Sequence, residues 1–113
     1  MPHLVLEHSA DLGDEAIRLT CEALFQTACN SPVFANIAAI KIRSIPCRNV
    51  HMGTKPQSFA HLTVWMLSGR DTEQKKTLAN DLLNVMDQHL PNVGVLTVDP
   101  RDMDSLTYAK RVI

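Results

Sequence analysis

The sequence has neither a long apolar run nor an excess of charge of one sign. No apolar stretch approaches the length that crosses a bilayer, and Glu7, His8 and Asp11 interrupt the apolar part of the N-terminus. The formal net charge is −1, from 11 Lys and Arg against 12 Asp and Glu. Such a balance provides no basic surface for nucleic acid or an anionic membrane. We therefore expect a cytoplasmic protein with no nucleic-acid partner and no membrane partner.

Residue patterns for metal, disulfide or phosphate sites are also missing. The three cysteines and five histidines are scattered through the chain, with no C-x-x-C pair and no H-E-x-x-H spacing. There is no glycine-rich phosphate loop, no Ser/His/Asp signature and no pair of carboxylates at informative spacing. We expect no metal site.

What is present is an ordinary globular composition, with 45% hydrophobic and 20% charged residues in 113. This length favours a single domain over residues 1–113, large enough to bury a core. Apolar periodicity and turn residues predict strands at 3–8, 37–45, 58–67 and 93–98, and helices from about 11 to 30 and 71 to 90. Asp71 and Gln74 resemble a capping box at the start of the second helix.

The element order β-α-β-β-α-β predicts an α+β fold, in which two βαβ units form a four-stranded mixed sheet with two helices on one face. A weak internal repeat at an offset of 58 residues supports two related halves: His3-Leu4 matches His61-Leu62, and Leu24-Phe25 matches Leu82-Leu83. Right-handed crossovers are expected in both halves. The segment Asp99 to Asp102 favours a turn, and the tail from Met103 is unassigned.

The strand at 58–67 indicates an oligomer. Both of its alternating sets are largely apolar, with Phe59, Trp65 and Leu67 on one face and Ala60, Leu62, Val64 and Met66 on the other. A strand buried on both faces has this pattern. Two helices can cover only one face of the sheet, so we expect another subunit to cover the second, in a closed ring.

Pro2 has two interpretations. A proline at the start of a strand is structurally ordinary, because it lacks the N–H that a sheet would use. If Met1 is removed, however, Pro2 presents a secondary amine. A free α-amino group has a pKa of about 7.7–8.0, and burial and nearby cations lower it toward the value that suits a general base.

Arg43 and Arg70 are the candidate anion-binding residues. Arg43 lies in an isoleucine-rich strand, where it can bind a ligand, form a structural ion pair or protect an edge strand. Arg70 lies in the S-G-R-D turn before a helix N-terminus, a favourable place for a carboxylate, although a solvated loop arginine is an equal alternative.

Together these residues resemble a known family. The M-P-H start with its L-V-L-E strand, the I-R-S of the second strand and the F-A-H-L-T-V…S-G-R segment before a helix are similar to the 5-carboxymethyl-2-hydroxymuconate isomerase family of the tautomerase superfamily. The resemblance extends from Met1 to about Asp99 and is weakest from Cys47 to Gln57.

This resemblance implies a homotrimer without cofactor or metal, in which Pro2 is the catalytic base and Arg43 and Arg70 bind carboxylates of the substrate. The implied reaction converts a carboxylated dienol, 5-carboxymethyl-2-hydroxymuconate, to its 2-oxo isomer in bacterial degradation of aromatic acids. The alternatives are another tautomerase-superfamily activity, on phenylpyruvate or as a decarboxylase, and a non-catalytic trimeric binding protein.

Overall fold

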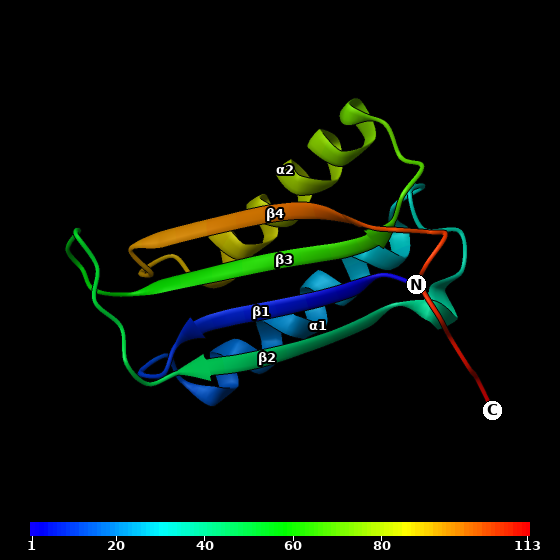
Figure 1. Ribbon diagram of the computed structural model, residues 1–113. Coiled ribbons are helices and arrows are strands. Elements are labelled where there is room, and N and C mark those ends of the chain that lie inside the picture. Colours follow the sequence, from blue (N-terminus) through cyan, green and yellow to red (C-terminus); the bar gives the residue numbers. More distant parts are fainter.

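Four strands and two helices make two layers in the computed structural model, which describes residues 1–113 (Figure 1). The elements are β1 (His3–Ser9), α1 (Asp14–Asn30), the short 3-10 helix η1 (Ile37–Ala39), β2 (Lys41–Cys47), β3 (Phe59–Leu67), α2 (Thr72–His89) and β4 (Val95–Met103). The sheet order is β2-β1-β3-β4; β1 is parallel to β2, β3 is parallel to β4, and β1 and β3 meet antiparallel in the centre. Both helices lie on the same side of the sheet, which confirms the predicted fold class.

The 58-residue repeat is visible in the core. In the first half, the buried positions Thr20, Leu24 and Ala28 of α1 pack toward the sheet, and in α2 the buried positions are Leu78, Leu82 and Met86, each 58 residues later. The same offset relates the buried Leu4 and Leu6 of β1 to the buried Leu62 and Val64 of β3. Two equivalent βαβ units therefore share one apolar core.

The edge strands differ from the sequence prediction at their ends. The stretch predicted as a strand from 37 begins with η1, where the Asn36 side chain accepts a hydrogen bond from the Ala38 N–H at 3.2 Å, and the strand continues past Pro46. At the other edge β4 runs through Pro100 to Met103, so the expected turn at Asp99 to Asp102 is wrong. Pro46 and Pro100 lie in the edge strands β2 and β4. The lack of an N–H in a proline is tolerated there, because an edge strand pairs on one side only.

The two helices begin differently. Asp71 accepts from the Gln74 N–H at 2.8 Å, and the Gln74 side chain accepts from the Asp71 N–H at 2.9 Å, so the predicted capping box is confirmed. The first helix starts at Asp14, later than the predicted start at about residue 11, and its N-cap Gly13 has no side-chain cap. Neither helix is long and apolar enough to cross a membrane.

One face of the sheet is uncovered. The side chains of β1 and β3 alternate between fully buried positions under the helices and partly exposed positions on the other side. Trp65 and Ile45 are 39% and 44% exposed on this open face. Figure 1 shows no helix on this side. The open face mixes apolar side chains such as Phe59 and Trp65 with the polar side chains of Glu7, His61 and Thr63.

Candidate active site

The topology brings four chain segments to one end of the sheet. β1 and β2 begin there, while the antiparallel β3 and its neighbour β4 end there. Pro2, directly before β1, is buried, and its carbonyl accepts a hydrogen bond from the Lys41 N–H at 3.1 Å. The turn that carries Arg70 follows β3 at the same end. Pro2 and Arg70, 68 positions apart in the sequence, thus lie in one region.

The electrostatics of this end favour a neutral amine. Partial burial lowers the pKa of the Met1 amine from 8.0, and the nearby charges of Arg70, Lys110 and Lys41 lower it further. Each of these effects disfavours the ammonium form. The amine of Pro2 would stand one residue inward, in the same surroundings, if Met1 were absent.

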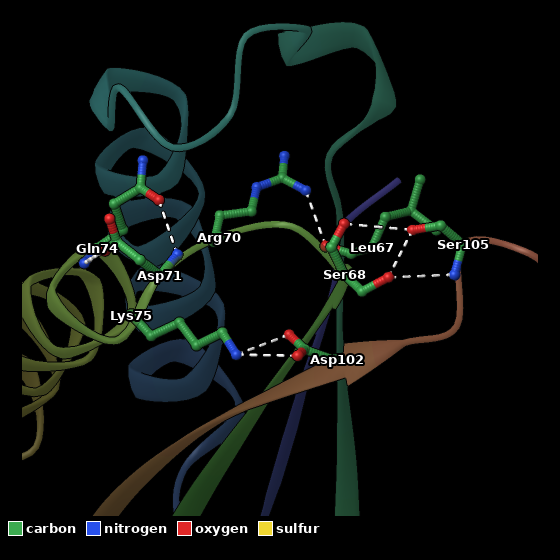
Figure 2. A network of polar contacts seen from close by, with 8 residues as sticks. All are labelled: Leu67, Ser68, Arg70, Asp71, Gln74, Lys75, Asp102 and Ser105. Atoms are coloured by element: carbon green, nitrogen blue, oxygen red, sulfur yellow. Dashed lines mark hydrogen bonds and ion pairs between the residues drawn. The ribbon is translucent and has the colours of Figure 1, made fainter.

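Arg70 is held rigidly without an acidic partner. Its Nη1 donates to the Leu67 carbonyl at 2.9 Å (Figure 2). Its Nη2 donates to the Val33 carbonyl at 3.1 Å, and the guanidinium lies 5.9 Å from the centre of the Phe34 ring. Gly69, with φ +130°, makes the turn that places Arg70, in a region that side-chain-bearing residues rarely adopt. Since a guanidinium has five N–H donors, three remain for a ligand.

Arg43 is exposed on the open face of the edge strand β2, opposite Val5 of β1. Its Nη1 donates to His3 Nδ1 at 3.3 Å. Arg43 is not among the groups that lower the pKa of the N-terminal amine. It is therefore connected to the Pro2 region through His3 rather than directly.

No acidic side chain neutralises the cations of this region. The four ion pairs of the chain join Arg18 to Glu15 and Glu22, Lys75 to Asp102, and Arg101 to Asp99. Lys41, Arg43, Arg70 and Lys110 form none. Unpaired cations beside the partly buried chain terminus provide donors suited to a carboxylate.

The segment after β4, residues 104–110, also contributes to this end, which the sequence did not indicate. Ser105 Oγ and Ser68 Oγ are 2.7 Å apart, and Lys75 pairs with Asp102 nearby (Figure 2). Tyr108 Oη lies 2.9 Å from His3 Nε2, and Lys110 Nζ lies 3.3 Å from Met1 Sδ. No periodicity in the tail could have predicted the last two contacts, because they join residues 105 and 109 positions apart.

The other polar features of the chain do not form a second centre of this kind. No group of three or more His, Cys, Asp and Glu side chains is arranged to hold a metal ion. A cavity of about 470 Å³ lies at the opposite end of the sheet, where Met52, Phe59 and Val95 are among its lining residues. The cationic end at Pro2 is thus the candidate active site.

A model of the family described as 5-carboxymethyl-2-hydroxymuconate isomerase matches residues 2–95, most of the chain. The chain belongs to this family. The match begins at Pro2 and includes Arg43 and Arg70, but it ends before the segment that carries Tyr108.

Several solved structures share the fold of this chain. A 5-carboxymethyl-2-hydroxymuconate isomerase from Deinococcus radiodurans R1 superposes with a TM-score of 0.84 at 22% identity, covering 97% of this chain and 88% of that one. A 5-carboxymethyl-2-hydroxymuconate delta-isomerase gives 0.77 at 20% identity, with 99% and 89% covered. A fused 4-OT wild-type symmetric trimer gives 0.75 at 19%, with 90% and 85% covered. No curated protein sequence matches the chain.

Proposed function

We propose that the protein is an isomerase that converts 5-carboxymethyl-2-hydroxymuconate to its 2-oxo isomer during degradation of aromatic acids. The observation that carries this proposal is the chain terminus itself: an amine with a lowered pKa, next to a buried proline and among cations without acidic partners, in a member of this family. A base of this kind works near neutral pH without a metal or a cofactor.

Pro2 acts as the base only after Met1 is removed. While Met1 is attached, the Pro2 nitrogen is part of a peptide bond, and its lone pair is delocalised into the carbonyl. The free secondary amine takes the proton of the substrate 2-hydroxyl. The electron pair of that O–H bond then forms the 2-oxo group, and the conjugated double bonds shift along the chain. The same ammonium returns its proton to the carbon at the end of the conjugated system, so the atoms and charges of the substrate are unchanged overall.

Arg70 and Arg43 bind the carboxylates of the substrate. The three free N–H donors of Arg70 allow a bidentate contact with a carboxylate, in a direction fixed by Leu67 and Val33. Arg43 binds a second carboxylate and draws electron density toward it, which stabilises the dienolate that forms when the hydroxyl proton leaves. A substrate with several carboxylates uses both arginines.

The proposed assembly is a homotrimer. The uncovered sheet face, with Trp65 partly exposed, supports a partner surface, and one of the similar solved structures is described as a symmetric trimer. A closed ring of three copies covers all three open faces by the same contact.

The proposal is tested by following the ultraviolet absorbance of 5-carboxymethyl-2-hydroxymuconate as it ketonises. Two preparations are compared: one whose intact mass lacks Met1, and one in which Met1 is retained by design. We expect rapid turnover only with the first. Turnover of phenylpyruvate enol alone would redirect the proposal to another tautomerase activity, and no turnover of either substrate would favour a non-catalytic binding protein.

A further inference from the structure

His3 lies between the side chains of Arg43 and Tyr108. Neither the sequence nor the family match indicates that these residues meet. One ring nitrogen, Nδ1, is 3.3 Å from Nη1 of Arg43, and the other, Nε2, is 2.9 Å from Oη of Tyr108. The Tyr108 ring meets the imidazole edge-on, with ring centres 6.4 Å apart and planes at 67°. An edge strand, the first strand and the C-terminal segment are thus joined through one imidazole.

The chemistry of these partners fixes the hydrogens. An arginine guanidinium only donates, so His3 Nδ1 must accept and carries no hydrogen. In a neutral imidazole the hydrogen is then on Nε2, which donates to Tyr108 Oη. The hydroxyl hydrogen of Tyr108 is left free for another acceptor.

The surroundings keep the imidazole neutral. Partial burial lowers the pKa of His3 from 6.5, and the charges of Arg43, Lys41 and the N-terminal amine lower it further. The tail adds the uncharged Tyr108, and Trp65, the partner of His3 on β3, brings no charge. A protonated His3 would have no acceptor for Arg43, so the arrangement exists only in the neutral form.

The C-terminal segment is shaped to bring Tyr108 to this place. Asp104 ends the strand and caps a turn: its carbonyl accepts from the Thr107 and Tyr108 N–H groups at 3.1 and 3.0 Å, and its side chain accepts from the Leu106 N–H at 2.9 Å. Ser105 ties the start of the turn to Ser68 at the end of β3. Tyr108 is half-buried, although the residues around it are exposed.

We propose that Tyr108 is a further substrate-binding residue, whose hydroxyl donates to a carboxylate of the substrate, and that His3 is the positioning residue that orients Tyr108 and Arg43 together. This inference rests on the proposed function, because it deepens the description of the same site. The segment that carries Tyr108 lies beyond the family match and takes part in recognising a carboxylate. The neutral hydroxyl of Tyr108 donates beside the charged guanidinium of Arg43.

The second half of the fold provides a matched control. His61 stands 58 residues after His3, and its Nδ1 lies 2.6 Å from Thr97 Oγ1. The strand position equivalent to Arg43 is Asp99, since Val5 faces Arg43 and Thr63 faces Asp99. The His61 ring is therefore hydrogen-bonded like that of His3, but its partner is neither an arginine nor a residue of the C-terminal segment.

The test uses full-length protein without Met1 and measures both the kinetics with 5-carboxymethyl-2-hydroxymuconate and the binding of adipate, an unreactive dicarboxylate. We expect Tyr108→Phe to raise KM and the adipate Kd about tenfold, with kcat within about twofold, because one hydrogen bond to a charged group is lost. His3→Gln should weaken binding at least as much, and the double variant should be no worse than His3→Gln alone. His61→Gln should bind adipate like the wild type.

Unchanged adipate binding in Tyr108→Phe, or losses that multiply in the double variant, would overturn the inference. If His3→Gln is unstable, two-bond ¹H–¹⁵N spectra of the wild type replace it: we expect the Nε2–H tautomer and a pKa below 6.5 for His3, and an Nδ1–H tautomer would also overturn the inference. Weaker adipate binding in Tyr108→Phe without any turnover in the wild type would leave this site standing and refute the proposed reaction. If Tyr108→Phe turns over the substrate with the same KM and kcat as the wild type, only this inference is refuted.

Discussion

Arg70 has a structural role, through hydrogen bonds to two carbonyls, and a proposed role in binding a carboxylate. Replacing it with alanine allows the loss of each role to be measured. Two N–H groups are held by the Val33 and Leu67 carbonyls, and three remain for a carboxylate. A hydrogen bond to a charged group contributes about 1.5–3 kcal/mol, and the contacts of one bidentate pair are not additive. We therefore expect Arg70→Ala to cost about 2–3 kcal/mol of substrate binding, or roughly a 30- to 150-fold loss in kcat/KM.

The assay compares two substrates. 5-Carboxymethyl-2-hydroxymuconate carries several carboxylates and should lose the full factor, whereas phenylpyruvate carries one and should lose much less. Urea unfolding, measured in parallel, should show a loss of about 1–2 kcal/mol from the two released carbonyls. Arg101→Ala is the control, since this exposed arginine pairs with Asp99 on β4. Equal losses for both substrates would refute the assignment of Arg70 to a second carboxylate.

Three further predictions concern stability and assembly. Leu82→Ala should lower the free energy of unfolding by about 2–5 kcal/mol in urea melts, because Leu82 is fully buried, whereas Leu106→Ala, at a 94% exposed site, should have no effect; equal losses would contradict the described core. Asp71→Ala should cost about 1 kcal/mol by removing the capping box, which a helix-sensitive thermal melt would detect as a lower Tm. Trp65→Glu should convert trimers to monomers in sedimentation velocity, since it places a charge on the open sheet face, and an unchanged sedimentation coefficient would contradict the assembly.

The fold was predictable where pattern and local chemistry agree. The strand around Leu62 and the Asp71 capping box were predicted from local pattern, and the repeat at Leu24 and Leu82 follows the buried helix positions. Only one face of that strand is fully buried within the chain. The edges were less predictable. An edge strand tolerates Pro46 and Pro100, residues that would end a central strand, so turn-like sequence continued as β-structure.

The sequence singled out Pro2, Arg43 and Arg70 as candidate site residues, but the contacts around them could not be predicted. Pro2 and Arg70 stand out from their local sequence, and the strand order that brings them together follows from two βαβ units. The contact of His3 with Tyr108 has no local signal, because it depends on how the chain leaves β4. Nothing in the sequence distinguishes Lys41 and Lys110 from other surface lysines. Only the structure places them where their charges lower the pKa of the N-terminal amine.

The central claim, that the Pro2 amine is the base, is tested most directly by titrating that amine in the Met1-free protein with ¹⁵N-labelled proline and comparing it with the pH dependence of kcat/KM. With Met1 in place, burial and the charges of Arg70, Lys110 and Lys41 lower the pKa of the Met1 amine. The Pro2 amine meets the same groups once Met1 is removed, so we expect its free base to form at a lower pH than for an ordinary terminus. We expect kcat/KM to rise with pH through this pKa and to level off above it, with the two titrations coincident. A rate that does not change while the amine titrates would contradict the account.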